Sequence, residues 1–415
     1  MRVAHLLRKL DPAEWSGTEM AIQRLFDGLR ASGVEPVVYC PRLHTGPGND
    51  PLSDSGFEVQ RFRAFVPVVG LSPQRKRQLV SVGGNLMSFD LIPSLWRERD
   101  LSVMHAHTLG RIGGIALTIA KRRRLPFVVT IHGGVLDLPE KIKKSFNAPV
   151  DGGWEWGKFF GALFQSHRLF CDADAILTCN GKEAALLQEQ FPHKRVLVQP
   201  HGVPFEIYRT DQRHAALQAF PQIANRQVLL CLGRIDPIKN QSWLVDQAPE
   251  LFRRYPRTML VLAGPCTDEP YGQRIRQQID RAGLADRVLL TGALPPNDPR
   301  VVGLLQSASA LLLPSLSETF GLVILEAWAA GAPIVSSRTS GPDALIDHGH
   351  NGLFFDLSDP QTFHEAIART LDNPLEAKEM AGRGTALAEQ YSVNVLAAKL
   401  KALYEEVIEA KRCTT

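Results

Sequence analysis

The chain has 415 residues and a formal net charge of +4, with 44% hydrophobic and 22% charged residues. This length predicts two domains of about 200 residues each, and the composition excludes a disordered or repetitive chain. The six cysteines form no C-x-x-C pair, so a reducing cytoplasm is expected. No run of about 18 uncharged apolar residues occurs, so we expect a protein that is neither secreted nor membrane-spanning.

Strands and helices alternate along the chain. The pattern of the first half predicts strands at residues 2–7, 37–40, 103–105, 127–131 and 175–179 and helices at 18–31 and 112–121. An irregular linker follows near 201–208. The second half then predicts strands at 228–232, 259–263, 288–291, 310–313 and 334–336, helices at 242–254 and 321–330, and a last amphipathic helix at 393–411. This alternation is typical of two doubly wound parallel sheets.

The excess positive charge lies in the first half of the chain. Residues 1–200 contain 26 Lys/Arg and 19 Asp/Glu, with basic clusters at 75–77, 121–124 and 141–144. Such clusters suit an anionic membrane surface or an anionic acceptor, although solvated helix ends explain each of them equally well. No nucleic-acid motif or aromatic stripe accompanies them, so nucleic acid is not expected as a partner.

The segment PSLSETFGLVILEAWAAGAPIVSS, residues 314–337, is the most informative part of the chain. It predicts a strand, a loop and a helix whose start lies at the carboxyl edge of a sheet, where backbone N–H groups favour a phosphate. Glu326 has only apolar neighbours one turn away on that helix, so its carboxylate needs a partner from elsewhere. A ribose diol fits this requirement, and an ion pair with Arg338 is the alternative. Glu318, near the helix start, would be ordinary on its own.

Two further segments follow predicted strands. In WSGTE, residues 15–19, Gly17 permits a close approach to a ligand, although helix capping by Ser16 or Thr18 also explains the pattern. In GRIDPIK, residues 233–239, the guanidinium of Arg234 and the ammonium of Lys239 can converge on a diphosphate that gains charge as it leaves. A pair of exposed surface cations is the alternative.

These segments together resemble the family 4 (GT4-like) retaining glycosyltransferases of the GT-B fold, in which two Rossmann-like doubly wound domains face each other across a cleft. The resemblance rests on residues 16–19, on GR with its later lysine at 233–239, and on the E-x7-E spacing of Glu318 and Glu326. It implies an acceptor-side domain at 1–203, a nucleotide-sugar-binding domain at 204–392, and a C-terminal helix at 393–415 that packs back on the N-terminal domain.

The resemblance also implies a role for each matching residue. Glu318 approaches the donor sugar, Glu326 holds the ribose, and Arg234 and Lys239 bind the diphosphate. His132, in the TIHG of residues 130–133, hydrogen-bonds the sugar or the phosphate; a general-base role and a buried structural histidine are the alternatives. The remaining donor contacts are expected at Gly17, Gly233, Phe320, Gly321 and Leu322, with the base near Leu294.

The implied reaction is a metal-independent, retaining transfer of a hexose from a UDP-sugar, or alternatively a GDP-sugar, to a glycan or lipid-linked acceptor. No cofactor is expected. The setting would be bacterial cell-surface polysaccharide or glycolipid biosynthesis, in the cytoplasm or peripherally on the inner face of the membrane. A sugar-nucleotide epimerase of the same fold and a non-catalytic nucleotide-sugar-binding protein are the alternatives.

The sequence departs from the family pattern at three places, and two motifs mimic metal sites. Ser16 and Asn240 stand where glycine is usual, and the linker reads HGVP at 201–204 rather than NGVD. Asp172 and Asp174 form a D-x-D, but they are predicted at the amino edge of a strand, away from the ligand edge. We also expect His105 and His107 to point to opposite faces of their strand.

Overall fold

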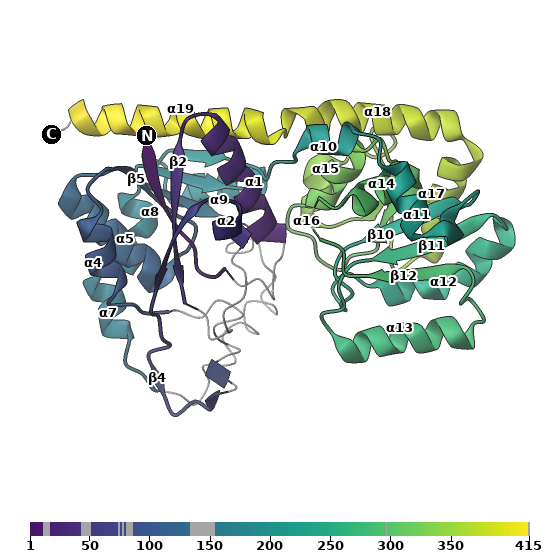
Figure 1. Cartoon of the computed structure of the whole chain (residues 1–415), viewed down its shortest axis with the longest axis horizontal. Helices are drawn as coiled ribbons and strands as arrows, with labels where there is room; N and C mark the ends of the chain where they lie inside the picture. The colour runs from purple at the N-terminus through teal and green to yellow at the C-terminus, as the bar shows by residue number, and fades with distance from the viewer. Residues whose placement is uncertain are drawn as a thin grey trace. The chain divides into compact units, whose positions relative to one another are not determined.

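The computed structural model describes residues 1–10, 17–42, 51–73, 75, 76, 79, 86–132, 154–295 and 297–413. Tertiary contacts divide the chain into an N-terminal unit, Met1–His201 with Asn394–Thr415, and a C-terminal unit, Gly202–Val393. Each unit contains one large sheet (Figure 1). Among the helices of the described ranges, none is long and apolar enough to cross a membrane.

The N-terminal unit has a seven-stranded sheet whose neighbouring strands are all parallel. From one edge to the other it contains β3 (Glu58–Phe62), β2 (Glu35–Pro41), β1 (Arg2–Leu6), β5 (Leu101–Ala106), β6 (Phe127–Ile131), β8 (Ala175–Thr178) and β9 (Val196–Val198). The chain order runs outward in one direction from β1 and in the other from β5. The strand order therefore reverses between β1 and β5, which is where open α/β sheets bind ligands at their carboxyl ends.

The C-terminal unit repeats this topology with six parallel strands. Their order is β12 (Val288–Gly292), β11 (Thr258–Ala263), β10 (Gln227–Leu232), β13 (Ala308–Leu313), β14 (Ile334–Ser337) and β15 (Leu353–Phe355). The reversal here lies between β10 and β13. The main helices of this unit are α12 (Gln241–Arg254), α13 (Glu269–Arg281), α14 (Pro299–Ser307), α15 (Leu322–Ala329), α16 (Ser340–Leu345), α17 (Pro360–Asp372) and α18 (Pro374–Gln390).

Helices cover both faces of the N-terminal sheet because its strands are apolar on both sides. One face packs against α5 (Gly110–Arg123), and the other packs against α1 (Gly17–Ala31). The last helix of the chain, α19 (Val393–Cys413), contributes Leu400 and Tyr404 to this second core, where both are fully buried. The shorter helices of the unit are α2 (Pro51–Asp54), α4 (Leu91–Arg97), α7 (Lys158–Leu163), α8 (Leu169–Asp172) and α9 (Gly181–Gln190).

The predicted fold class, two doubly wound parallel sheets, is confirmed. Each strand and helix predicted from the sequence is present, with ends that differ by at most two residues. Among the strands of the two large sheets, β3, β9 and β15 were not predicted, and neither was the small antiparallel pair of β4 (Val68–Val69) and β7 (Trp154–Glu155). β3 and β9 lie at the two edges of the first sheet, and β15 lies at one edge of the second. An edge strand pairs with only one neighbouring strand, so its sequence carries a weaker strand pattern.

Candidate active site

Three charged residues predicted for the site, Arg234, Lys239 and Glu318, lie where the strand order of the C-terminal unit reverses. One loop, residues 233–240, follows β10, and a second loop, residues 314–321, follows the neighbouring strand β13. The N–H of Leu316 donates to the carbonyl of Ile238 over 2.8 Å and joins the two loops. Lys239 Nζ donates to Glu318 Oε2, and both side chains are largely enclosed, with 21% and 15% of their surface exposed. The sequence therefore brings two of the predicted residues into direct contact.

The first loop is held by Asp236, a residue that the sequence interpretation missed. Asp236 Oδ1 accepts from the N–H groups of Ile238 and Lys239, each over 3.0 Å. Its other oxygen lies 3.2 Å from Arg234 Nη2. The buried carboxylate of Asp236 thus shapes the turn that carries both cations. The sequence did contain a signal for this role of Asp236, which stands three residues before Lys239. Aspartate side chains commonly accept hydrogen bonds from N–H groups two and three residues later in the chain.

Asn240 explains one departure from the family pattern. Its backbone lies in the left-handed region with φ 57°, immediately before helix α12. Glycine adopts this conformation at little cost, and asparagine is one of the few other residues that tolerate it. The Asn240 side chain also donates to the carbonyl of Pro314 over 3.2 Å, so it links the two loops.

The second loop leads into helix α15, which begins at Leu322 and not one residue earlier as predicted. Gly321 precedes it with φ 86°, and a side chain here would be strained. Glu318 lies in the loop before the helix, with its carbonyl accepting from the N–H of Gly341 over 2.8 Å. Phe320 and Gly321 are buried, and the first N–H groups of α15 point toward the carboxyl edge of the sheet. These groups can hold an anion.

Glu326 lies inside α15 with 8% of its surface exposed. The alternative partner considered for it, Arg338, forms an ion pair with Asp343 over 2.8 Å and stacks on Phe354. Leu294 follows β12 at the same edge of the sheet and is partly exposed. Gly233 and Gly264 end the strands β10 and β11, and a Cβ on Gly264 would lie 2.1 Å from the Gly233 carbonyl oxygen. The close approach of these two turns therefore requires glycine.

Three buried polar atoms around these loops have no hydrogen-bond partner within the described ranges: Gln241 Oε1, Ser315 Oγ and Thr339 Oγ1. Buried polar atoms are normally paired, so such a group indicates a site that a ligand or solvent completes. The nearby cavity of about 390 Å³ is lined by residues of the β14 and β15 carboxyl ends, including Ser337 and Arg338. It is adjacent to the site, since Ser337 Oγ donates to the carbonyl of Ser315 over 2.7 Å.

The predicted residues of the N-terminal unit lie at the corresponding edge of the other sheet. Gly17 is the first residue of α1 and is exposed, whereas Ser16 falls outside the described residues. His132 directly follows β6, and its ring stacks on His201 with centroids 5.4 Å apart. Burial lowers the pKa of His132 to about 3, with further contributions from His201 and Arg8, so its imidazole is neutral.

The expectation that His105 and His107 point to opposite faces is wrong. Their rings stack with centroids 4.2 Å apart, because residues two positions apart on a strand share a face. His5 on β1 is paired with His105 in the sheet register, and its ring lies 5.2 Å from each of the other two. Sequence reasoning therefore missed a buried histidine cluster next to His132.

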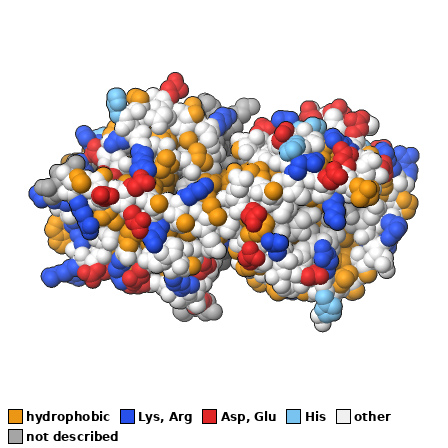
Figure 2. Space-filling view, turned by 90° about the horizontal axis from the view of Figure 1, so that it is seen from above, with side chains coloured by type: hydrophobic (Ala, Val, Ile, Leu, Met, Phe, Trp, Pro, Cys, Tyr) orange, Lys and Arg blue, Asp and Glu red, His pale blue; other side chains and the backbone are white. Residues whose placement is uncertain are grey.

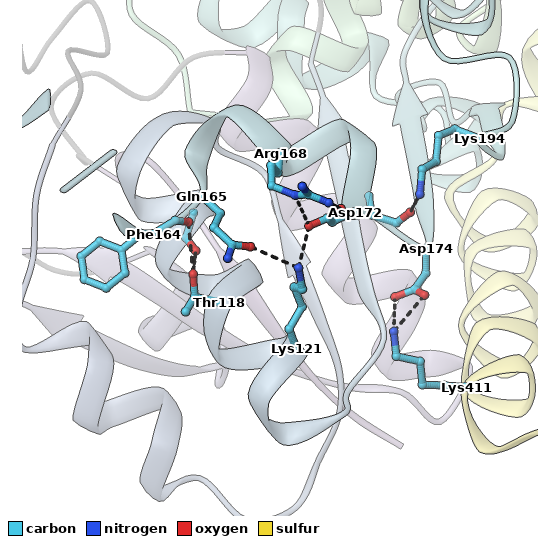
Figure 3. A network of polar contacts seen from close by, with 11 residues as sticks. Thr118, Lys121, Phe164, Gln165, Arg168, Asp172, Asp174, Lys194 and Lys411 are labelled. Carbon is cyan, nitrogen blue, oxygen red and sulfur yellow. Dashed lines mark hydrogen bonds and ion pairs between the residues drawn. The ribbon is translucent and has the colours of Figure 1, made fainter. Parts of the chain in front are cut away.

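Asp172 and Asp174 lie at the amino end of β8, and each is engaged by cations (Figure 3). Asp172 accepts from Arg168 and from Lys121, and these contacts hold the pKa of its carboxyl well below the usual range. Asp174 accepts from the N–H of Phe127 over 2.8 Å and pairs with Lys411 of α19 over 3.1 Å. Both carboxylates therefore join elements of the N-terminal unit.

Comparison with known proteins agrees with this geometry. Residues 215–387 match the family described as "Glycosyl transferases group 1", and residues 16–202 match the "Glycosyl transferase 4-like domain". A D-inositol 3-phosphate glycosyltransferase from Thermobispora bispora is 27% identical over 388 residues, which cover 86% of this chain and 87% of that protein. The enzyme of the same name from Acidothermus cellulolyticus is 29% identical, over 68% of this chain and 62% of its own length.

Solved structures share the fold. HepE of Anabaena, crystallised with UDP, has a TM-score of 0.74 at 18% identity, covering 98% of this chain and all of that one. Its complex with UDP-glucose has a TM-score of 0.70. The two family matches together span almost the whole chain, and the switch-point loops carry the charged residues that the family resemblance predicts. The chain belongs to the group 1, GT4-like glycosyltransferases, which are retaining enzymes of the GT-B fold.

Proposed function

We propose that this glycosyltransferase moves a hexose from a UDP-sugar to a glycan or lipid-linked acceptor in bacterial cell-surface polysaccharide or glycolipid biosynthesis. The observation that carries the proposal is the Lys239–Glu318 pair, set between two loops at the switch point beside the start of helix α15. The UDP and UDP-glucose complexes of HepE, which has the same fold, support the choice of donor.

Each charged group has a distinct task in this proposal. Arg234 and Lys239 neutralise the diphosphate, together with the first N–H groups of α15. An ammonium has three donors, so Lys239 can hold Glu318 and a phosphate oxygen at once. Glu326 accepts from the ribose hydroxyls, Glu318 and Phe320 lie against the sugar, and Leu294 lies near the base. His132 and Gly17 are the contributions of the N-terminal unit to donor binding.

Sugar transfer then proceeds by front-face substitution, which retains the anomeric configuration. The departing phosphate oxygen takes the proton of the acceptor hydroxyl while the sugar passes through an oxocarbenium-like state. The two cations and the helix start stabilise the charge that develops on the leaving diphosphate. Because protein cations supply this charge, transfer should persist in EDTA. Loss of activity that Mn²⁺ or Mg²⁺ restores would contradict this part of the proposal.

The acceptor is proposed to reach the enzyme at an anionic membrane surface. The lysines at 141–144, which motivate this idea, lie outside the described residues. Of the other clusters, Lys121 pairs with Asp172, and Arg123 donates to the carbonyls of Leu95 and Arg99, so these cations have structural partners. Positive and negative side chains are interspersed on the face drawn in Figure 2. Sedimentation with anionic vesicles at low salt tests the idea, and failure of the whole chain to sediment favours a dissolved acceptor.

Glu326→Ala tests the ribose assignment. Calorimetry should show at least tenfold weaker binding of UDP, because the ribose hydroxyls lose their acceptor. Glu250→Ala is the matched control, since Glu250 is a helical carboxylate of the same unit with 59% of its side chain exposed, and it should leave UDP affinity unchanged. Equal UDP affinity in both variants would remove Glu326 from the site. Assays for transfer and for interconversion of free UDP-sugars separate this function from an epimerase.

A further inference from the structure

Four histidines of the N-terminal unit form a buried cluster at the carboxyl side of its sheet, and a fifth, His201, stacks on the last of them. His5 lies on β1, His105 and His107 lie on and just after β5, and His132 follows β6. His5 and His105 are fully buried, and His107 has 8% of its surface exposed. Only His132 belongs to the proposed donor site, so the others need an explanation of their own.

Three of these rings form a continuous chain of hydrogen bonds. His5 Nδ1 lies 2.9 Å from His107 Nε2, and His107 Nδ1 lies 2.9 Å from His132 Nε2. The two ends of the chain, His5 Nε2 and His132 Nδ1, are buried atoms without a hydrogen-bond partner in the part of the protein that the structure describes. Burial lowers the pKa of all three imidazoles, so each ring is neutral and carries one proton.

The number of protons on the three neutral rings links the tautomers of the two end rings, His5 and His132. Three neutral rings carry three protons, and each of the two ring-to-ring contacts uses one of them. The third proton sits either on His5 Nε2 or on His132 Nδ1. If it sits on one end, every ring must donate in the same direction, and the nitrogen at the other end has a free lone pair. The tautomer of His132 is therefore coupled to that of His5, and the difference between the surroundings of the two ends decides both.

The surroundings of His5 favour one of the two states. Its ring packs on Phe26 with centroids 4.5 Å apart, in the core formed by α1 and α19. His132, by contrast, follows β6 at the carboxyl edge of the sheet and is only partly buried, so solvent or a ligand can accept a hydrogen bond at that end. A fully buried N–H without an acceptor is costly, so the proton should leave His5 Nε2. His5 Nδ1–H then donates to His107, and His107 Nδ1–H donates to His132 Nε2. This direction leaves His132 with a proton on Nδ1.

We propose that His107 and His5 are positioning residues that hold His132 as the Nδ1–H tautomer, so that His132 donates a hydrogen bond to a donor-substrate oxygen and does not act as the general base. The inference rests on the proposed function for the identity of that oxygen, but not for the tautomer itself. It chooses between the roles considered for His132, because a protonated Nδ1 has no lone pair with which to accept the acceptor's proton.

A metal ion is the competing explanation for the cluster. One nitrogen from each of His5, His105 and His107 lies within 4.8 Å of the others. Both nitrogens of His105 are already bonded, to Tyr404 Oη over 2.5 Å and to Thr130 Oγ1 over 2.6 Å. Both nitrogens of His107 are also hydrogen-bonded, one to His5 and the other to His132. A metal would have to break several of these bonds, so the hydrogen-bonded arrangement is the better account.

Nuclear magnetic resonance of the full chain labelled with [¹⁵N]histidine reads the tautomer directly. The His132 signals, assigned from their loss in His132→Asn, should show a protonated Nδ1 and an unprotonated Nε2. His107→Asn keeps a side-chain N–H donor near the position of Nδ1, and should preserve this pattern. His107→Leu removes the donor, and should change it. A wild-type His132 protonated on Nε2, or stoichiometric zinc in the purified protein by elemental analysis, overturns the proposal.

Kinetics supply the second measurement. His107→Leu should lower kcat at least tenfold. The affinity for UDP should change less than twofold, because the proposed UDP contacts other than His132 and Gly17 lie in the C-terminal unit. His107→Asn should stay within about threefold of wild type in kcat. His105→Phe is the matched control. It keeps a stacked ring at a position that takes no part in the His5–His107–His132 hydrogen bonds, so it should leave the His132 spectrum unchanged. An equal loss of kcat in His107→Leu and His107→Asn contradicts the proposal. If the wild type transfers no sugar, the proposed function fails, whereas the spectrum still decides the tautomer.

Discussion

Lys239 shows how single residues place charge at this site. Its backbone N–H donates to Asp236, its side chain donates to Glu318, and the next residue, Asn240, adopts the left-handed conformation. Each contact narrows the range of positions that the ammonium can occupy. A cation fixed in this way does not have to reorganise when negative charge develops on a leaving group, which is the condition for effective electrostatic catalysis.

Lys239→Ala should therefore lower kcat at least tenfold, about 1.4 kcal/mol of transition-state stabilisation. The expected reason is the loss of one positive charge at the leaving diphosphate. Steady-state transfer assays with saturating donor measure the effect. Lys378→Ala is the control, because Lys378 is an exposed lysine of the same unit and should retain wild-type turnover. Unchanged turnover in Lys239→Ala would show that the pair with Glu318 is only structural.

The charged members of the candidate site could be predicted from the sequence, and the residues that orient them could not. The spacing of Arg234 and Lys239, and that of Glu318 and Glu326, led to this prediction, and the structure brings Lys239 and Glu318 into contact. Their roles toward a diphosphate and a sugar stay predictions. Asp236 is an ordinary turn residue until the structure shows which N–H groups it accepts. The histidine cluster was missed because a period of two was misapplied at residues 105 and 107, and because its other members come from separate strands.

Among the elements, α19 has the clearest structural consequence. Leu400 and Tyr404 of this helix are buried in the core of the N-terminal unit, and Lys411 pairs with Asp174 before β8. The Tyr404 hydroxyl also bonds His105 on β5. The amphipathic pattern predicted the helix and its length, whereas the face against which it packs depends on strands nearly 300 residues earlier.

Leu400→Ala should reduce the free energy of unfolding by about 2–5 kcal/mol, because it leaves a cavity in a closed core. Urea denaturation followed by circular dichroism measures the change. Lys399→Ala, on the exposed side of the same helix, should change it by less than about 0.5 kcal/mol. If the two variants lose equal stability, α19 contributes through its helical propensity and not through its buried face.

At the scale of the whole molecule, the histidine cluster should make stability depend on pH. Burial lowers the pKa of His5, His105 and His107 well below the usual range, that of His132 to about 3 and that of His201 to about 4. Below about pH 6.5 the unfolded chain therefore binds more protons than the folded protein. Each of these histidines therefore lowers the free energy of unfolding as the pH falls. Their contribution to stability is fully present above about pH 6.5 and is lost as the pH falls below it.

We expect the free energy of unfolding to decrease between pH 7.5 and pH 5.5, by up to about 1.4 kcal/mol for each histidine. Urea titrations at the two pH values provide the test. His105→Phe should shrink the difference between them by one such increment. Carboxyl groups with lowered pKa, such as Asp172, titrate only below about pH 4 and do not contribute in this window. Stability that is equal at both pH values would contradict neutral burial of the cluster.

The division of the chain also sets the order in which its parts can fold during synthesis. The N-terminal unit needs residues 394–413 to close its core, yet the entire C-terminal unit is translated before them. At about 5–20 residues per second, the ribosome delivers α19 roughly 10–40 s after residue 201. For that time the apolar surface around Phe26 and Leu29 has no helix to cover it. The nascent N-terminal unit is therefore a natural client for a chaperone, and the C-terminal unit is the first to complete its fold.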